Sequence, residues 1–186
     1  MSRLRPVLAL AVLLATPPAA AQGASDVQFT FGAAAVLPGT VYVEPYDWDT
    51  GAGVGLSAAL DYAIVPRLSA GLLLQYTSVG FTEVDVTGKT IGFGGTLKVL
   101  VGDPRKVHFK VGGTVMYQLD SLDGADTDDA RGLGVGAIAA VLYPVSPRLC
   151  AVGQLGFTSQ PSGGNSDAEV TWAPLFFVGA GVAFGP

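Results

Sequence analysis

Four ionisable side chains interrupt stretches of small and apolar residues, and they are the first candidates for chemistry. They are one carboxylate, two amines and the only imidazole of the chain, at Asp61, Lys98, His108 and Lys110. Large apolar residues flank each of them in the sequence. If these side chains are enclosed, they should form an internal ion-pair network, since buried charges are paired. The alternative is a wet, net-positive constriction that passes small anions.

Side chains alternate with a period of two through almost all of the chain after residue 22, with no helical period of useful length. This pattern predicts β-strands, because successive side chains of a strand point to opposite faces. Each predicted strand is near the ~9–11 residues that a tilted strand needs to cross a bilayer. Eight strands are predicted, at residues 27–36, 53–64, 68–78, 91–101, 107–117, 133–143, 149–158 and 170–184.

The connections between these strands alternate in length. Longer loops are predicted at residues 37–51, 79–89, 118–131 and 159–168. The short connections each contain one Pro-Arg pair, namely Pro66-Arg67, Pro104-Arg105 and Pro147-Arg148. Short turns at one end and longer loops at the other are typical of an up-and-down outer-membrane barrel, so we expect the Pro-Arg pairs at periplasmic turns.

The middle Pro-Arg turn also predicts a register. A hairpin that pairs symmetrically about Pro104 places Lys98 opposite Lys110. Two like charges in that arrangement are costly unless they are compensated. Asp61 is the only carboxylate available on the same faces of the predicted strands.

The N-terminal segment "MSRLRPVLALAVLLATPPAAAQG" has a basic start, an apolar run and a close of small residues. This layout predicts a secretory signal peptide at residues 1–21, cleaved after Ala21, and a mature domain at residues 22–186. Removing Arg3 and Arg5 from the ten basic residues leaves eight against fifteen acidic ones. An acidic balance argues against nucleic acid as a partner, because binding to nucleic acid requires many Lys and Arg contacts with phosphates.

Charge is sorted between the two ends of the predicted barrel. Arg67, Arg105, Lys106 and Arg148 lie at the short turns. Twelve of the fifteen acidic residues lie on the long-loop side: Glu44, Asp47, Asp49, Glu83, Asp85, Asp120, Asp123, Asp126, Asp128, Asp129, Asp167 and Glu169. The acidic stretch "DSLDGADTDDARG" lacks the spacing of a calcium loop, so we expect a solvated loop and no metal site.

One face of each predicted strand carries the larger apolar residues, and the other carries small or polar ones. The interior of an eight-stranded barrel is only just wide enough for side chains, so the larger rows should face lipid. Aromatic residues should form girdles near the strand ends, at Tyr62, Tyr76, Tyr117, Tyr143, Phe157, Trp172 and Phe184. The barrel must close, because an open edge would leave backbone groups unpaired in lipid.

With these features, the chain resembles the small eight-stranded outer-membrane barrels of OmpA, OmpX and opacity-protein type. The resemblance covers roughly residues 25–184, through the strand count, the loop asymmetry and the last strand "FFVGAGVAF". It implies an all-β, closed, eight-stranded antiparallel up-and-down transmembrane β-barrel in the bacterial outer membrane. Family members usually end on the aromatic residue itself, whereas Gly185 and Pro186 follow Phe184 here.

The resemblance implies a structural or surface-interaction role, with the alternative of a narrow pore or conduit for small solutes. The expected partners are outer-membrane lipid, lipopolysaccharide and an extracellular partner that contacts the long loops, and we expect a monomer. No cofactor and no catalytic residues are expected. Ser-His chemistry needs a base beside its nucleophile, and the sole histidine is predicted inside the barrel near the short turns.

Overall fold

The computed structural model describes residues 27–123, 129–166 and 168–185. The predicted signal peptide lies outside these residues. Among them, no helix is long and apolar enough to cross a lipid bilayer. The described residues form nine strands: β1 (Val27–Val36), β2 (Gly39–Val43), β3 (Tyr46–Val65), β4 (Leu68–Phe81), β5 (Thr87–Val101), β6 (His108–Asp123), β7 (Ala130–Ser146), β8 (Leu149–Gly164) and β9 (Val170–Phe184).

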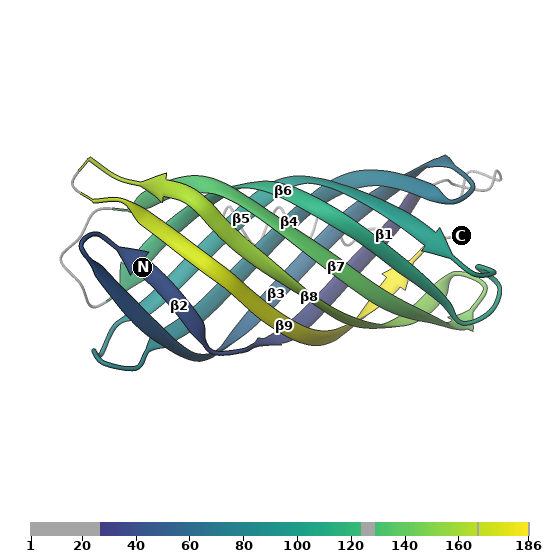
Figure 1. The fold of residues 1–186 in the computed structure, drawn as a ribbon. Coiled ribbons are helices and arrows are strands. Elements are labelled where there is room, and N and C mark those ends of the chain that lie inside the picture. Colours follow the sequence, from purple (N-terminus) through teal and green to yellow (C-terminus); the bar gives the residue numbers. More distant parts are fainter. Residues whose placement is uncertain (1–26, 124–128, 167, 186) are drawn as a thin grey trace, which may run out of the picture.

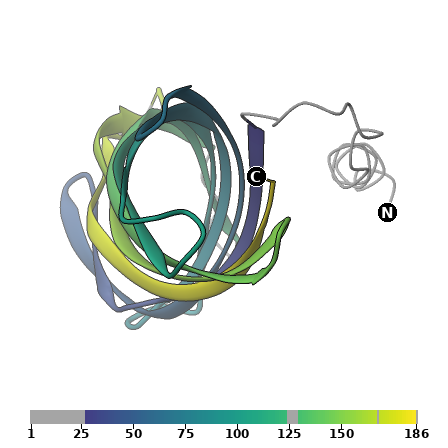
Figure 2. The same ribbon diagram turned by 90° about the vertical axis from the view of Figure 1, so that its right-hand side faces the viewer.

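The strands form one closed antiparallel ring with eight positions around it (Figures 1 and 2). β1 and β2 share one position, because both pair with β3 on one side and β9 on the other. The interruption between them falls at Leu37-Pro38, where proline lacks the N–H that a ladder requires. The predicted closed eight-stranded barrel is therefore confirmed.

The strands extend further on the long-loop side than the sequence predicted. The predicted loop at residues 37–51 is instead a hairpin of β2 and the start of β3. β4 and β5 leave only residues 82–86 between them, and β8 runs on to Gly164. Alternation of apolar residues marks the part of a strand that faces lipid, whereas backbone pairing continues past that point.

Three bulges lie near this end of the barrel. The register shifts in β3 between Thr50 and Gly53, in β8 before Ser162, and in β9 between Trp172 and Leu175. An extra residue in one strand exchanges inward and outward faces beyond the bulge. The predicted girdle position of Trp172 is therefore wrong, and its side chain is buried inside the barrel.

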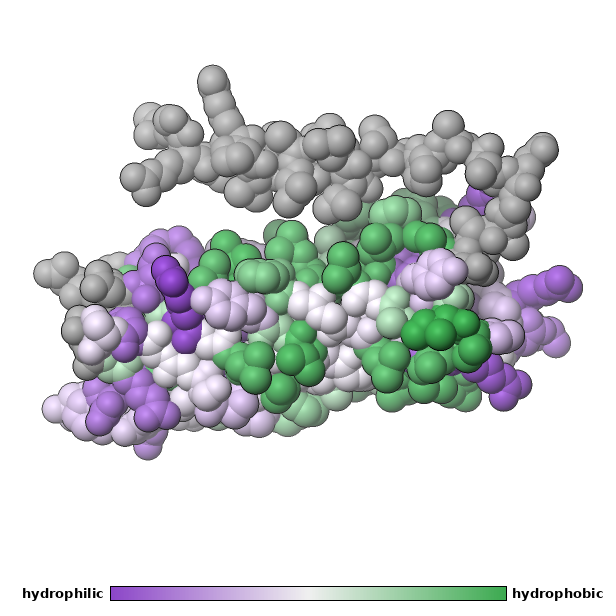
Figure 3. Space-filling view, turned by 90° about the horizontal axis from the view of Figure 1, so that it is seen from above, coloured by the Kyte–Doolittle hydropathy of each residue, from purple (hydrophilic) through white to green (hydrophobic). Residues whose placement is uncertain are grey.

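The large apolar side chains of the spanning strands face outward, as expected. On β5 the exposed row runs from Val101 to Ile91, and Lys89 takes the next outward position. Figure 3 shows this apolar surface in green along the middle and toward the short-turn end, with hydrophilic residues at the tip of that end and over a broader region at the hairpin end. The barrel is thus longer than its apolar band, and its hairpin end extends beyond it.

Candidate functional site

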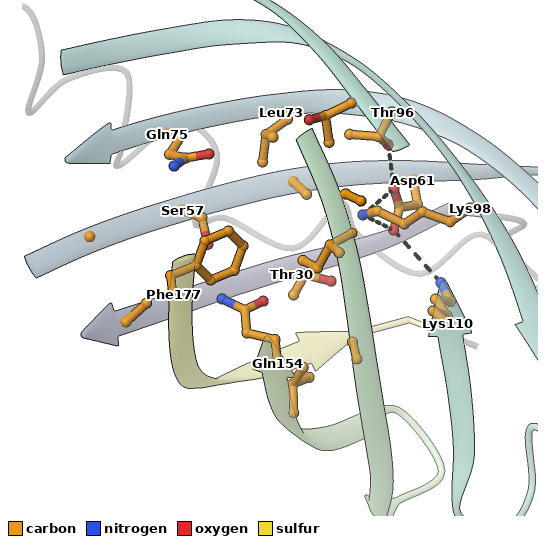
Figure 4. A pocket seen from close by; sticks show the side chains of 18 of the residues that line it. Thr30, Ser57, Asp61, Leu73, Gln75, Thr96, Lys98, Lys110, Gln154 and Phe177 are labelled. Atoms are coloured by element: carbon orange, nitrogen blue, oxygen red, sulfur yellow. Dashed lines mark hydrogen bonds and ion pairs between the residues drawn. The ribbon is translucent and has the colours of Figure 1, made fainter. Parts of the chain in front are cut away.

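The half of the lumen near the short turns holds an ion-pair cluster. Asp61 on β3 accepts two hydrogen bonds from Lys98 Nζ on β5, at 2.9 Å to Oδ1 and 3.0 Å to Oδ2. Lys110 Nζ on β6 lies 3.7 Å from Asp61 Oδ2. Thr96 Oγ1 donates a further bond of 3.3 Å to Asp61 Oδ1. Figure 4 shows both amines converging on the single carboxylate.

This cluster is enclosed by the barrel wall. The side chains of Asp61, Lys98 and Lys110 are 2%, 9% and 13% exposed. Lys110 also donates to Gln28 Oε1 on β1, which ties the cluster across the lumen. Two amines share one carboxylate, so the cluster carries one positive charge in excess.

His108, the fourth predicted member, does not join the ion pairs. Its ring is buried, and Nδ1 is 2.9 Å from the backbone oxygen of Lys106, two residues earlier. The structure therefore brings Asp61, Lys98 and Lys110 together and places His108 against the turn.

The predicted register of the β5–β6 hairpin is wrong. Lys98 pairs with Gly112 and Lys110 pairs with Leu100, so the two lysines are not opposite each other. The pairing of β5 with β6 is centred one residue later than Pro104. Asp103 stabilises the turn in this position. Its carboxylate accepts a bond of 2.9 Å from the Arg105 N–H, and its carbonyl accepts one of 2.9 Å from the Lys106 N–H.

All three Pro-Arg turns lie at the same end of the barrel (Figure 1). Arg67, Arg105 and Arg148 are exposed there, and the N–H of Arg148 donates to Ser146 Oγ at 3.4 Å. Ser and Asp at the residue before such a pair stabilise the turn by accepting from the backbone. That this end faces the periplasm stays a prediction.

A cavity of about 70 Å³ adjoins the ion-pair cluster toward the middle of the barrel. Lys98, Lys110 and Asp61 form part of its wall, and the rest combines apolar side chains, such as Leu73, Leu142 and Phe177, with polar ones (Figure 4). Among them are Gln28, Thr30, Ser57, Gln75 and Gln154. The cavity therefore has a charged end, with two amines and one carboxylate, and mostly apolar walls.

The other half of the lumen is filled by a second cluster, the cap, which sequence reasoning missed. Its buried residues are Val36, Val41, Val79, Ala130, Val170, Trp172 and Leu175, and Val43, Trp48, Phe81 and Phe177 pack against them. The signal that could have revealed it is the pair of prolines, Pro161 and Pro174, at the positions where β8 and β9 bulge. Proline within a strand often marks a bulge.

Polar groups are enclosed beside the cap. Thr90 Oγ1 donates a bond of 2.7 Å to Asp120 Oδ1, and Asp120 is 3% exposed. Gln160 Nε2 donates to the backbone oxygen of Val170 at 3.2 Å. A cavity of about 40 Å³ lies against Asp120 and Trp172. The cap is thus an apolar cluster edged by amide, hydroxyl and carboxylate groups.

Carboxylates surround the hairpin end and form what we call the acidic rim. Lys89 on β5 forms an ion pair with Asp123, and this hydrogen bond raises the pKa of Lys89 above its ordinary value. Arg131 is the other basic residue there among those described. The exposed members of the rim are Glu44, Asp47, Asp49, Glu83, Asp85, Asp123, Asp129 and Glu169. Asp126, Asp128 and Asp167 lie outside the described residues.

No protein-family model matches the sequence, and no curated protein matches it. Solved structures do match the fold. Neisserial surface protein A is 16% identical with a TM-score of 0.65, over 89% of this chain and all of that one.

Two further structures show the same architecture. The outer membrane protein OprG from Pseudomonas aeruginosa is 13% identical with a TM-score of 0.58, over 88% of this chain and 97% of that one. A major outer membrane protein from Thermus thermophilus is 17% identical with a TM-score of 0.54, over 85% and 98% of the two chains. The chain therefore has the fold of the small eight-stranded outer-membrane β-barrels of the OmpA and OmpX type.

Proposed function

We propose that this protein is a monomeric barrel of the bacterial outer membrane with a closed lumen, and that it acts through its acidic rim. In this proposal the role is structural or one of surface contact, and the chain is not an enzyme. The observation that supports it is the filling of the lumen in both halves, by the Asp61 cluster and by the cap. The short turns face the periplasm, and the acidic rim faces outward.

The size of the internal cavities argues against a channel. Cavities of about 70 and 40 Å³ hold only a few water molecules each, since one water needs about 10–15 Å³ on this measure. A strand of 20 residues such as β3 is roughly 65 Å long at ~3.3 Å per residue. Even with the tilt of the strands, the barrel axis is several times longer than either of these two cavities, so neither forms a through-path by itself.

The charge of the rim indicates the chemistry of its partner. Eight exposed carboxylates with two basic residues among them create a negative potential that favours cationic surfaces. A basic protein surface fits this end. Lipopolysaccharide is anionic and would need bridging divalent cations there.

Conductance across a planar bilayer tests the closed lumen. The purified protein should give no discrete current steps at moderate voltage. A variant that loses both obstructions, with Asp61→Ala and Trp172→Ala, serves as the opened control and should conduct. Reproducible steps from the unmodified protein would establish the alternative function, a narrow pore.

Binding of a cationic peptide tests the rim. Hexalysine should bind the protein in zwitterionic micelles, and the binding should weaken as salt is raised. Changing Glu44→Gln, Asp47→Asn and Asp49→Asn together should weaken it several-fold, because the first hairpin carries three of the rim carboxylates. The matched control is Asp103→Asn at the short-turn end, which should bind as the unmodified protein does. Equal loss in both variants would refute a role for the rim.

A further inference from the structure

With both amines protonated, the ion-pair cluster in the lumen has one more positive charge than its own residues neutralise. Lys98 takes both oxygens of Asp61 at 2.9 and 3.0 Å, so Lys110 has only a long contact of 3.7 Å to the same carboxylate. Its remaining partner is the neutral amide oxygen of Gln28. Burying an ammonium group without a counter-charge is costly.

No other carboxylate in the described part of the chain can supply that charge. Asp120 is the next one inside the barrel and lies ten residues along β6 from Lys110, which is roughly 33 Å at ~3.3 Å per residue. Asp103 is exposed in the turn and accepts bonds from the backbone there. The end of the barrel nearest the cluster carries Arg67, Arg105, Lys106 and Arg148, which add to the positive potential.

The space beside the two amines suits a small ligand. The cavity of about 70 Å³ is bounded at one end by Lys98, Lys110 and the Asp61 carboxylate. Each ammonium group has three N–H donors, and Asp61 does not accept all of them. The hydroxyls of Thr30 and Thr114 and the amide of Gln154 are further donors on its wall. Room for a few water molecules is also room for one monatomic anion with part of its hydration shell.

We propose that the lumen holds a small inorganic anion of halide size, bound between Lys110 and the donors of this cavity. The anion is the counter-charge of the cluster and stabilises the folded barrel. This site is separate from the acidic rim and requires no passage through the membrane. If the lumen binds no anion, the proposed surface role is not affected. If the rim does not bind hexalysine, the proposed anion site is not affected.

Anomalous diffraction locates such an anion directly. Crystals of the full chain grown in bromide in place of chloride should show a bromine peak within about 3.5 Å of Lys110 Nζ, a hydrogen-bond distance for a large anion. A cavity that contains only water, with no anomalous peak, would overturn the proposal.

Stability against anion concentration gives an independent test in solution. At constant ionic strength, replacing gluconate by chloride should increase the folding equilibrium constant of the barrel in vesicles. Above the dissociation constant the increase should be about tenfold for each tenfold rise in chloride, because only the folded state binds. A folding constant that does not change with chloride would contradict the site.

Two variants assign the effect to the lumen. Lys110→Met removes the excess charge and should abolish the chloride dependence. Lys89→Met removes an equivalent charge from the exterior and should leave the dependence as it is in the unmodified protein. If Lys110→Met retains the full dependence, the site does not exist as described. If that variant does not fold, the bromide experiment on the unmodified protein decides the question.

Discussion

At the level of single residues, Asp61 is the charged side chain that holds the lumenal ion-pair cluster together. Among the described residues, it is the only carboxylate that pairs with these two amines, which lie on different strands, and its side chain is almost fully buried. Removing one member of such a group leaves the others charged, enclosed and mutually repulsive.

Asp61→Asn should therefore lower the free energy of unfolding by about 3–5 kcal/mol, the usual cost of breaking a buried ion pair from one side. Urea unfolding of the barrel in lipid vesicles measures this quantity. Asp49→Asn on the exposed rim changes the same group and should cost less than about 1 kcal/mol. Equal losses for the two variants would mean that the lumenal cluster adds nothing specific.

Trp172 is the largest of the buried residues of the cap, and its burial depends on the β9 bulge. Trp172→Ala should destabilise the barrel by about 3–5 kcal/mol, because it leaves a cavity among Val41, Val170 and their neighbours. Tyr46→Ala is the control, since Tyr46 is an exposed aromatic of the adjacent hairpin and should lose less than about 1 kcal/mol. If urea unfolding shows no difference between the two, the cap is not a packed cluster.

At the level of elements, neighbouring strands approach closely on their inner face. A Cβ built on Gly94 of β5 would collide with the backbone oxygen of Val115 on β6. The next residue, Gly95, faces outward, and the nearest atom to its Cβ would be the Gly71 oxygen at 3.9 Å. A side chain at position 94 would therefore collide with the neighbouring strand, whereas a side chain at position 95 has room.

Gly94→Ala should destabilise the barrel by about 1–3 kcal/mol through overpacking, and Gly95→Ala should be nearly neutral. Both substitutions add one methyl group to the same strand, so the difference isolates the face. Urea unfolding of the two variants in identical vesicles provides the comparison. A larger loss at Gly95 would reverse the assignment of inner and outer faces.

The β8 and β9 elements show how the position of a proline changes the contents of the barrel. Pro161 and Pro174 lie in the bulges of β8 and β9, each of which contains one extra residue. On the hairpin side of the β9 bulge, Trp172 is buried and pairs with Gln160 of β8. Without the bulge in β9, unbroken alternation would place Trp172 on the outer face. The cap is therefore a consequence of irregular pairing at one end of the sheet.

At the level of the whole molecule, closure and orientation determine where the apolar surface lies. β1 pairs with β9 along eight residues, which completes the ring and leaves no free edge among the described strands. Rows such as the one containing Val115 are exposed on the outside of this ring. In lipid this closure pairs the backbone groups that a free edge would leave exposed.

Spin labels on neighbouring residues should report this orientation in vesicles. On a Cys150→Ser background, a label at Val115 should be accessible to oxygen and protected from a water-soluble nickel chelate. A label at Thr114, which lines the central cavity, should be immobilised and protected from both. Accessibility of Val115 to the nickel chelate would contradict insertion of this band in the bilayer.

The sequence alone determined that eight strand positions surround the barrel, which end carries the short turns and the face of most residues. These properties follow from alternation and from Pro-Arg turns, which are local signals. The narrow interior of an eight-stranded barrel then requires that the small residues face inward. It also selected Asp61, Lys98 and Lys110 as inward-facing, because parity along a strand is local as well.

Only the tertiary structure decided how those residues meet. The offset of Lys98 from Lys110 depends on where Asp103 centres its turn, and the sharing of Asp61 depends on the stagger of β3 against β5 and β6. The cap depends on bulges at which pairing with a neighbouring strand shifts by one residue. Register and stagger are properties of pairs of strands that are distant in sequence, so the pattern of any single strand does not contain them.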